Sequence, residues 1–389
     1  MLANILLVIF YLIAPAGVLF ICRKNRIFNK IGPVLTLYLL GVLVANIGIF
    51  PTEESAYSKL FGFMESFSGA LIPLALPMIL FGCNFRKFSL RKSVKAFVVG
   101  AFSVVAFVLI GYAIFKDNLG AEGSIMGASL TGQYLGGAAN LGAIKQMLGL
   151  SPDKFVILST CNLIVSFFYL MFLMGGGVRL ARWIVGRRRG KEQNVKVEEY
   201  IEENPYKGFG TKESLKQLGK VLAAAVVVMG ISVALGTVAG RGEGISMVVL
   251  ILTITTLSLL LTCWKEVRTW DKSYDAGMYL IYVFCLVMAT MADLSKIDWE
   301  QSLYILIYQA VIIFGSLFLT ILLAKAFRID ADTAVITSDT LINSPLCVPM
   351  IAATMKNKDV IMTGIANGLL GYAVGNYIGF LMFNLLGLF

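Results

Sequence analysis

The stretches TGQYLGGAANLGAI, at residues 131–144, and TSDTLINSPLCVPMIAA, at residues 337–353, decide the fold of this chain. Both are apolar enough to enter a bilayer, yet each carries Gly, Pro, Asn, Ser, Thr or Asp at its centre. Inside a membrane every backbone N–H and C=O needs a partner, so a helix breaks there only where protein or a water-filled cavity surrounds it. Interrupted segments at matching positions of two halves are typical of a transporter's binding site.

The sequence around these two stretches is strongly apolar. Of the 389 residues, 58% are hydrophobic and 14% are charged, whereas soluble domains carry about 25% charged residues. Several apolar runs approach or exceed the length that crosses a bilayer, about 20 residues. We predict an all-α polytopic membrane protein with ten spans, at 2–21, 34–50, 67–81, 96–115, 155–174, 221–238, 245–261, 276–291, 303–323 and 360–389.

Basic residues indicate whether the interrupted segments cross the membrane. Short loops rich in Lys and Arg stay on the cytoplasmic side. If both segments crossed, the basic loops at 23–30 and 86–95 would lie opposite the basic stretch at 179–220. If each segment enters and leaves on one side, as a re-entrant hairpin, most of the 33 basic residues share a side. Hairpins are therefore favoured, and broken spanning helices are the alternative.

Five spans and one hairpin per half give each half an odd number of crossings. The halves are then inverted repeats whose hairpins enter from opposite faces. We predict a first repeat at 1–185, a cytoplasmic linker at 186–219 and a second repeat at 220–389, with both termini outside. The interval from Asn84 to Tyr169 nearly equals that from Asp293 to Tyr377, which supports a duplication.

Both interrupted segments carry groups that can hold a solute and an ion. Gly136 and Gly137 allow a tight reversal and let the backbone approach a ligand without a Cβ. Pro345 and Pro349 remove N–H donors, which leaves carbonyl groups free to face a cation. We predict solute contacts from Thr131, Gln133, Gly136, Gly137, Asn140, Asn343 and Ser344, and ion coupling by Asp339, Thr340 and Asn343, with Asp339 as the place for Na⁺.

Two charged residues in these segments have alternative interpretations. A carboxylate inside a membrane segment is costly and marks a functional site by default, which favours Asp339 as a coupling-ion or proton site. Its alternative role is to cap a half-helix. Lys145 could bind an anionic solute, or it could neutralise a carboxylate when no ion is bound. Lysine stems also reach readily to the membrane surface, and we predict that position.

Several functional classes find no support in the sequence. The chain has no His, no Walker A loop and no HExxH motif, so we expect no enzyme and no cofactor beyond Na⁺. The net charge of +10 follows from basic cytoplasmic loops, so nucleic acid is not expected as a partner. A channel or a membrane sensor remains a different-class alternative, because a Gly-rich re-entrant loop can also line a pore.

Short motifs in both halves resemble a known family. They are ADL at 292–294, the polar run before a proline at 338–345, GYAVGNYIG at 371–379, and TGQYLGGAAN at 131–140. Together they resemble the YjcL-like membrane family of unknown function, which is grouped with inverted-repeat secondary transporters such as bile acid/sodium, glutamate/sodium, 2-hydroxycarboxylate and cation/proton carriers. The resemblance implies a core domain that carries the hairpins and moves against a scaffold domain that often dimerises.

This chain departs from the family pattern in its second interrupted segment. Asn343, Ser344 and Pro345 stand where relatives tend to have Gly-Gly-Pro, and Asp339 stands near an expected Asn. The interrupted segments and the resemblance together lead us to expect a secondary transporter that couples a small anionic or zwitterionic organic solute to Na⁺ or H⁺ by an elevator-like movement. The expected setting is a homodimer in the bacterial cytoplasmic membrane. A monovalent cation/proton antiporter is the closest alternative.

Overall fold

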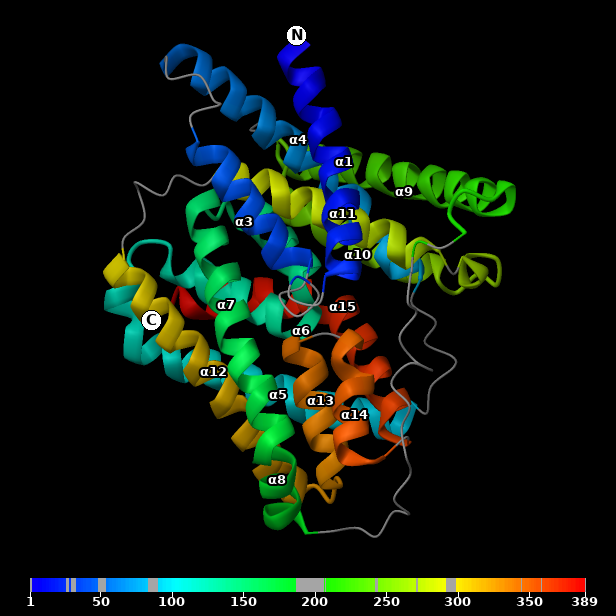
Figure 1. Cartoon of the computed structure of the whole chain (residues 1–389). Helices are drawn as coiled ribbons and strands as arrows, with labels where there is room; N and C mark the ends of the chain where they lie inside the picture. Colours follow the sequence, from blue (N-terminus) through cyan, green and yellow to red (C-terminus); the bar gives the residue numbers. More distant parts are fainter. Residues whose placement is uncertain are drawn as a thin grey trace. The chain divides into compact units, whose positions relative to one another are not determined.

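The computed structural model describes residues 2–25, 28, 33–47, 54–82, 90–186, 206, 208–241, 244–270, 272–291, 299–343, 345–357 and 359–388. Every regular element within these ranges is helical, as Figure 1 shows. The chain is therefore an all-α polytopic membrane protein, which confirms the predicted fold class.

Each predicted span corresponds to a helix of the described residues. Eight helices are long and apolar enough to cross a membrane. They are α1 (Leu2–Lys24), α4 (Glu54–Phe81), α5 (Leu90–Leu119), α7 (Pro152–Phe172), α9 (Lys212–Ala239), α11 (Ser273–Thr290), α12 (Trp299–Ala326) and α15 (Asp359–Leu386). Two shorter apolar helices, α3 (Pro33–Asn46) and α10 (Met247–Leu261), correspond to the other two spans. After α7 the chain continues through a π-helical turn, η2 (Leu173–Gly177), into α8 (Val178–Val185).

The chain divides into two compact units, and each is assembled from segments that are distant in sequence. Unit 1 comprises Met1–Gly82, Lys145–Thr160 and Thr211–Ser302. Unit 2 comprises Cys83–Ile144, Cys161–Gly210 and Leu303–Phe389. Because both units draw on both halves of the chain, they do not coincide with the predicted repeats. The division into repeats at 1–185 and 220–389 stays a prediction.

Helix α11 forms the centre of unit 1. Its second half, from Ile281 to Thr290, is buried along its whole length. Buried hydroxyl groups join it to the neighbouring helices: Tyr11 of α1 shares a hydrogen bond of 2.7 Å with Thr290, and Ser273 donates to the Met78 carbonyl of α4 at 2.7 Å. In a membrane such bonds satisfy polar groups that lipid cannot.

In unit 2, α5 and α12 run antiparallel. Near the start of α5, Lys95 Nζ donates to the Phe327 carbonyl at 2.6 Å, just after the end of α12. At the other end of α5, the ring of Phe115 lies 6.5 Å from that of Tyr304, near the start of α12. These two contacts define the two ends of unit 2.

The first interrupted segment is a helical hairpin. Helix α6 (Gly123–Leu148) leaves helical geometry at Gly136 and Gly137. A methyl group on Gly132 would meet the Ile144 side chain and the Asn140 carbonyl. A straight helix would place residues 132 and 144 about 18 Å apart, so the chain reverses at the glycine pair. The helix begins earlier than the predicted start of this segment at 131.

The second interrupted segment is also a hairpin. It consists of α13 (Ala331–Asn343), the 3₁₀ turn η6 (Pro345–Cys347) and α14 (Val348–Met355), and Figure 1 shows α13 and α14 side by side. A methyl group on Gly364 of α15 would lie 2.9 Å from Ile336 of α13 and 2.8 Å from Val348 of α14. Both legs therefore flank one position of α15. This segment also begins earlier than predicted, at Ala331 rather than at residue 337.

The two hairpins open toward opposite ends of unit 2. The first begins beside the end of α5, where a methyl group on Gly123 would lie 3.0 Å from Leu119. The second begins beside the start of α5, where one apolar cluster joins Ala96 of α5 to Ala324 of α12 and Ala334 of α13. The charge pattern predicts that the two hairpins enter from opposite faces of the membrane. The side of the membrane on which each end lies remains a prediction.

Candidate functional site

Both hairpin tips rest on the same stretch of α15. A methyl group on Gly368 would collide with Pro345 of the second tip, and one on Gly371 would collide with the Leu135 carbonyl of the first. Gly368 and Gly371 are about 4.5 Å apart along the helix axis. The glycine face of α15 therefore brings the two breaks together near the middle of that helix. Gly375 and Gly379 continue the same face along the first hairpin.

The first tip depends on one backbone conformation. Gly137 has φ 67° and ψ −164°, a region essentially restricted to glycine. The Tyr372 ring of α15 lies beside it, because a methyl group there would stand 3.6 Å from the ring. Asn140, one turn later, is fully buried, and its Nδ2 lies 3.5 Å from the carbonyl oxygens of both Gly371 and Tyr372. The Asn140 amide thus connects the tip to α15.

The second hairpin carries the carboxylate of the site. Asp339 is 0% exposed, and its Oδ1 accepts a hydrogen bond of 2.8 Å from Asn343 Nδ2. Its Oδ2 is buried without a hydrogen-bond partner. Nearby, the Tyr169 hydroxyl of α7 and the Ser338 hydroxyl share a bond of 2.9 Å. Asp339 therefore has one oxygen held by the protein and one oxygen available to a proton or a cation.

Within the described residues of unit 2, no buried basic side chain compensates the charge of Asp339. The one buried basic residue of the described chain is Lys145, which is 7% exposed and counts with unit 1. Its predicted position at the membrane surface is not what the structure shows. A buried carboxylate without a basic neighbour is costly unless it takes up a proton or a cation.

Other predicted site residues differ in what their polar groups do. The hydroxyl of Thr131 donates to the Gly127 carbonyl at 2.9 Å, and that of Thr340 donates to the Ile336 carbonyl at 2.7 Å. Each hydroxyl group thus donates its one hydrogen within its own helix. Gln133 is buried, and its Oε1 has no partner. Ser344 lies outside the described residues.

Asn367 of α15 belongs to the site, although it is not among the residues predicted from the sequence. It is fully buried, and its Nδ2 donates to the Thr337 hydroxyl of α13 at 2.7 Å. Its Oδ1 has no partner. An Asn inside an apolar span was the available signal, because polar groups at that depth are often functional.

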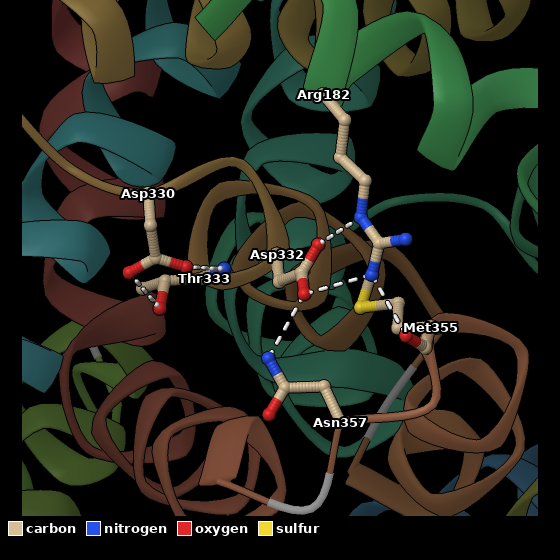
Figure 2. A network of polar contacts seen from close by, with 6 residues as sticks. All are labelled: Arg182, Asp330, Asp332, Thr333, Met355 and Asn357. Atoms are coloured by element: carbon tan, nitrogen blue, oxygen red, sulfur yellow. Dashed lines mark hydrogen bonds and ion pairs between the residues drawn. The ribbon is translucent and has the colours of Figure 1, made fainter. Parts of the chain in front are cut away.

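The base of the second hairpin is fastened to α8, as Figure 2 shows. Arg182 binds both carboxylate oxygens of Asp332, at 2.7 and 2.9 Å, and also donates to the Met355 carbonyl at 2.7 Å. Asn357 donates to Asp332 at 2.9 Å. Asp332 begins one leg and Met355 ends the other, so this cluster holds the legs together. Asp330 caps the first leg by accepting from the Thr333 N–H at 2.9 Å.

The described residues contain no group of three or more His, Cys, Asp or Glu side chains that could hold a metal ion. Of the described carboxylates, only Asp339 is buried. A cation at this position would therefore be bound by one carboxylate oxygen and by neutral oxygens. Oxygen ligands suit hard cations rather than soft ones, and the single charge of Asp339 balances a monovalent ion.

Two comparisons relate the chain to known proteins, one of which is a membrane protein. A family model described as "Protein of unknown function (DUF819)" matches residues 10–389. The chain is also 22% identical over 363 residues to the uncharacterized membrane protein YjcL of Bacillus subtilis (strain 168), covering 89% of this chain and 88% of that protein. These matches confirm the resemblance found in the sequence motifs.

Proposed function

This chain belongs to the DUF819 family, and we propose that it is a secondary active transporter. In this proposal it moves a small anionic or zwitterionic organic solute by alternating access, coupled to Na⁺ or H⁺. An elevator-like movement of unit 2, the unit that contains both tips, is the expected form of alternating access. The proposal includes transport without catalysis, no cofactor other than Na⁺, a homodimer, and the bacterial cytoplasmic membrane as its location.

Two hairpins that enter unit 2 from opposite ends and meet on one stretch of α15 support this function. Residues of both tips are partly exposed: Gly137 and Ala138 in the first and Asn343 and Pro345 in the second. Broken helices at membrane depth are typical of transporter sites, where released backbone groups bind the solute and the ion. Asp339 then provides the coupling charge.

Uptake by reconstituted vesicles tests this proposal. The wild-type protein should accumulate solutes from a labelled mixture of organic acids and amino acids when a Na⁺ or pH gradient is imposed. Asp339→Asn should abolish the dependence on the gradient, because the amide cannot take up a proton and has no negative charge to balance a bound cation. Asp117→Asn, which removes an exposed carboxylate near the end of α5, is the matched control and should behave as wild type. Gradient dependence that survives in Asp339→Asn would remove Asp339 from the mechanism.

A monovalent cation/proton antiporter is the second candidate. It is favoured by Asp339, the only carboxylate that is buried among the described residues. A single buried carboxylate can exchange a cation for a proton without any solute. In the same vesicles, exchange of cations for protons under an imposed pH gradient, without solute uptake, would favour this candidate.

A further inference from the structure

Three amide side chains of the site are oriented in the same way. Asn140, Asn343 and Asn367 each use the Nδ2 group to bind the protein. The unpartnered buried atoms of this site include the Oδ1 atoms of Asn140 and Asn367 and Oδ2 of Asp339. All of these atoms are hydrogen-bond acceptors.

The chemistry of the partners fixes each orientation. Asn140 faces two carbonyl oxygens and Asn343 faces a carboxylate oxygen, so only an NH₂ group can point at them. Asn367 faces the Thr337 hydroxyl, whose hydrogen is already donated to the Thr333 carbonyl at 2.7 Å. That hydroxyl can therefore only accept, and Asn367 must offer its NH₂. The amide oxygens are left for a ligand.

The amide oxygens lie close to the meeting point of the tips. Asn140 binds the Gly371 carbonyl, and Asn367 precedes Gly371 by one helical turn of α15. One turn is about 5.4 Å, so both amides serve the same stretch of that helix. Buried oxygens without donors are costly, and a group with several N–H donors and a positive charge would satisfy them.

We propose that this acceptor set recognises an ammonium group on the transported solute. The inference rests on the proposed transport function and narrows its solute to zwitterions of the amino-acid type. A solute with carboxylates alone would bring further acceptors to a site that already has an excess of them, next to the charge of Asp339. Such like-charge contacts are unfavourable in a buried site.

Matched pairs of small molecules test the ammonium group. Thermal unfolding of the purified full-length protein is followed at constant Na⁺ with glycine or glycolate, leucine or 2-hydroxyisocaproate, and glutamate or 2-hydroxyglutarate. Each pair differs by an ammonium in place of a hydroxyl group. We expect at least one amino acid to raise Tm and its hydroxy-acid partner to leave Tm unchanged. Equal shifts within the pairs, or no shift by any amino acid, would overturn the proposal.

Variants at Asn367 connect the effect to the acceptor set. Asn367→Leu removes the oxygen at similar volume and should weaken binding of the active amino acid about 10-fold or more, the scale of one buried hydrogen bond to a charged group. Asn367→Asp keeps an acceptor and adds negative charge. The Thr337 hydroxyl can turn from the Thr333 carbonyl to donate to the new carboxylate, so this variant should bind at least as tightly as wild type. Asn384→Leu, at an exposed amide of the same helix, is the control and should change nothing.

The outcomes separate this inference from the transport proposal and from an ion site. If hydroxy acids are accumulated in the vesicle assay, transport stands and the ammonium assignment is wrong. If no solute is accumulated, the transport proposal itself fails. If Asn367→Leu removes stabilisation by Na⁺ and leaves that by the amino acid intact, the acceptor set belongs to the coupling ion and the ammonium assignment is again wrong.

Discussion

At the scale of single residues, polar groups occupy two separate places in the second hairpin. Asp339, near its tip, keeps one oxygen free. Arg182 and Asp332, at its base, are fully used in holding the structure. The contrast follows from partners: a planar guanidinium matches a carboxylate at two points and leaves it little capacity for a ligand. The base is thus structural and the tip is available for binding.

Loss of Arg182 should loosen this base. Arg182→Ala removes three hydrogen bonds and leaves the partly buried Asp332 without its cation, so the free energy of unfolding should fall by about 2–3 kcal/mol. Arg182→Lys keeps the charge without the planar fork and should recover only part of this loss. Denaturation of the purified protein with increasing SDS measures the difference. Lys220→Ala, which breaks the exposed pair with Glu266, is the control and should have no measurable effect. Wild-type stability in Arg182→Ala would contradict the assigned role.

At the scale of elements, α15 is the surface on which both hairpins are placed. Its glycines allow backbone and tip residues to approach where a Cβ would collide. Close packing at small residues is a common way to hold helices together in lipid. The position of each tip is therefore set by which residues of α15 are glycine.

A methyl group at the central glycine should displace the first tip. Gly371→Ala places a Cβ against the Leu135 carbonyl, and we expect a loss of about 1–3 kcal/mol of stability from overpacking. Gly230→Ala in α9 is the matched control, because no atom lies within 4 Å of the added methyl group. It should be neutral or stabilising by about 0.5–1 kcal/mol, since alanine favours helix. Both variants can be compared by thermal unfolding, and equal stability of the two would contradict the packing.

At the scale of the whole molecule, the sequence predicted where helices break better than it predicted what the breaks contact. The pair Gly136 and Gly137 and the residue Pro345 indicated the tips because backbone chemistry is local. Asn367 was not predicted as a site residue, because an amide in a span can be assigned to a site only when its neighbours are known. The bond between Arg182 and Asp332 joins distant segments, and no periodicity reports such a contact. The interleaved units were unpredictable for the same reason.

Membrane topology is the prediction that concerns the entire chain. Single cysteines replacing Lys116, Asp153 and Arg328, in a background without native cysteines, report the side of each loop. An impermeant maleimide added outside intact cells should label positions 116 and 153, which flank the first hairpin. Position 328, before the second hairpin, should react only after the membrane is opened. Labelling of 116 and 153 from opposite sides would mean that α6 crosses the bilayer.

The interleaving of the two units has a consequence for biosynthesis. Unit 1 includes residues as late as Ser302, and unit 2 includes residues as late as Phe389. Neither unit can be complete until those residues have been synthesised. During synthesis, α5 and the first hairpin must remain in the membrane before α12, α13 and α15 exist. The buried oxygens of that hairpin would meanwhile face lipid or transient neighbours. Those oxygens would be protected if the insertion machinery released the helices in groups, together with their later partners. Nascent chains that end before α12 lack these partners and should be the forms most readily degraded.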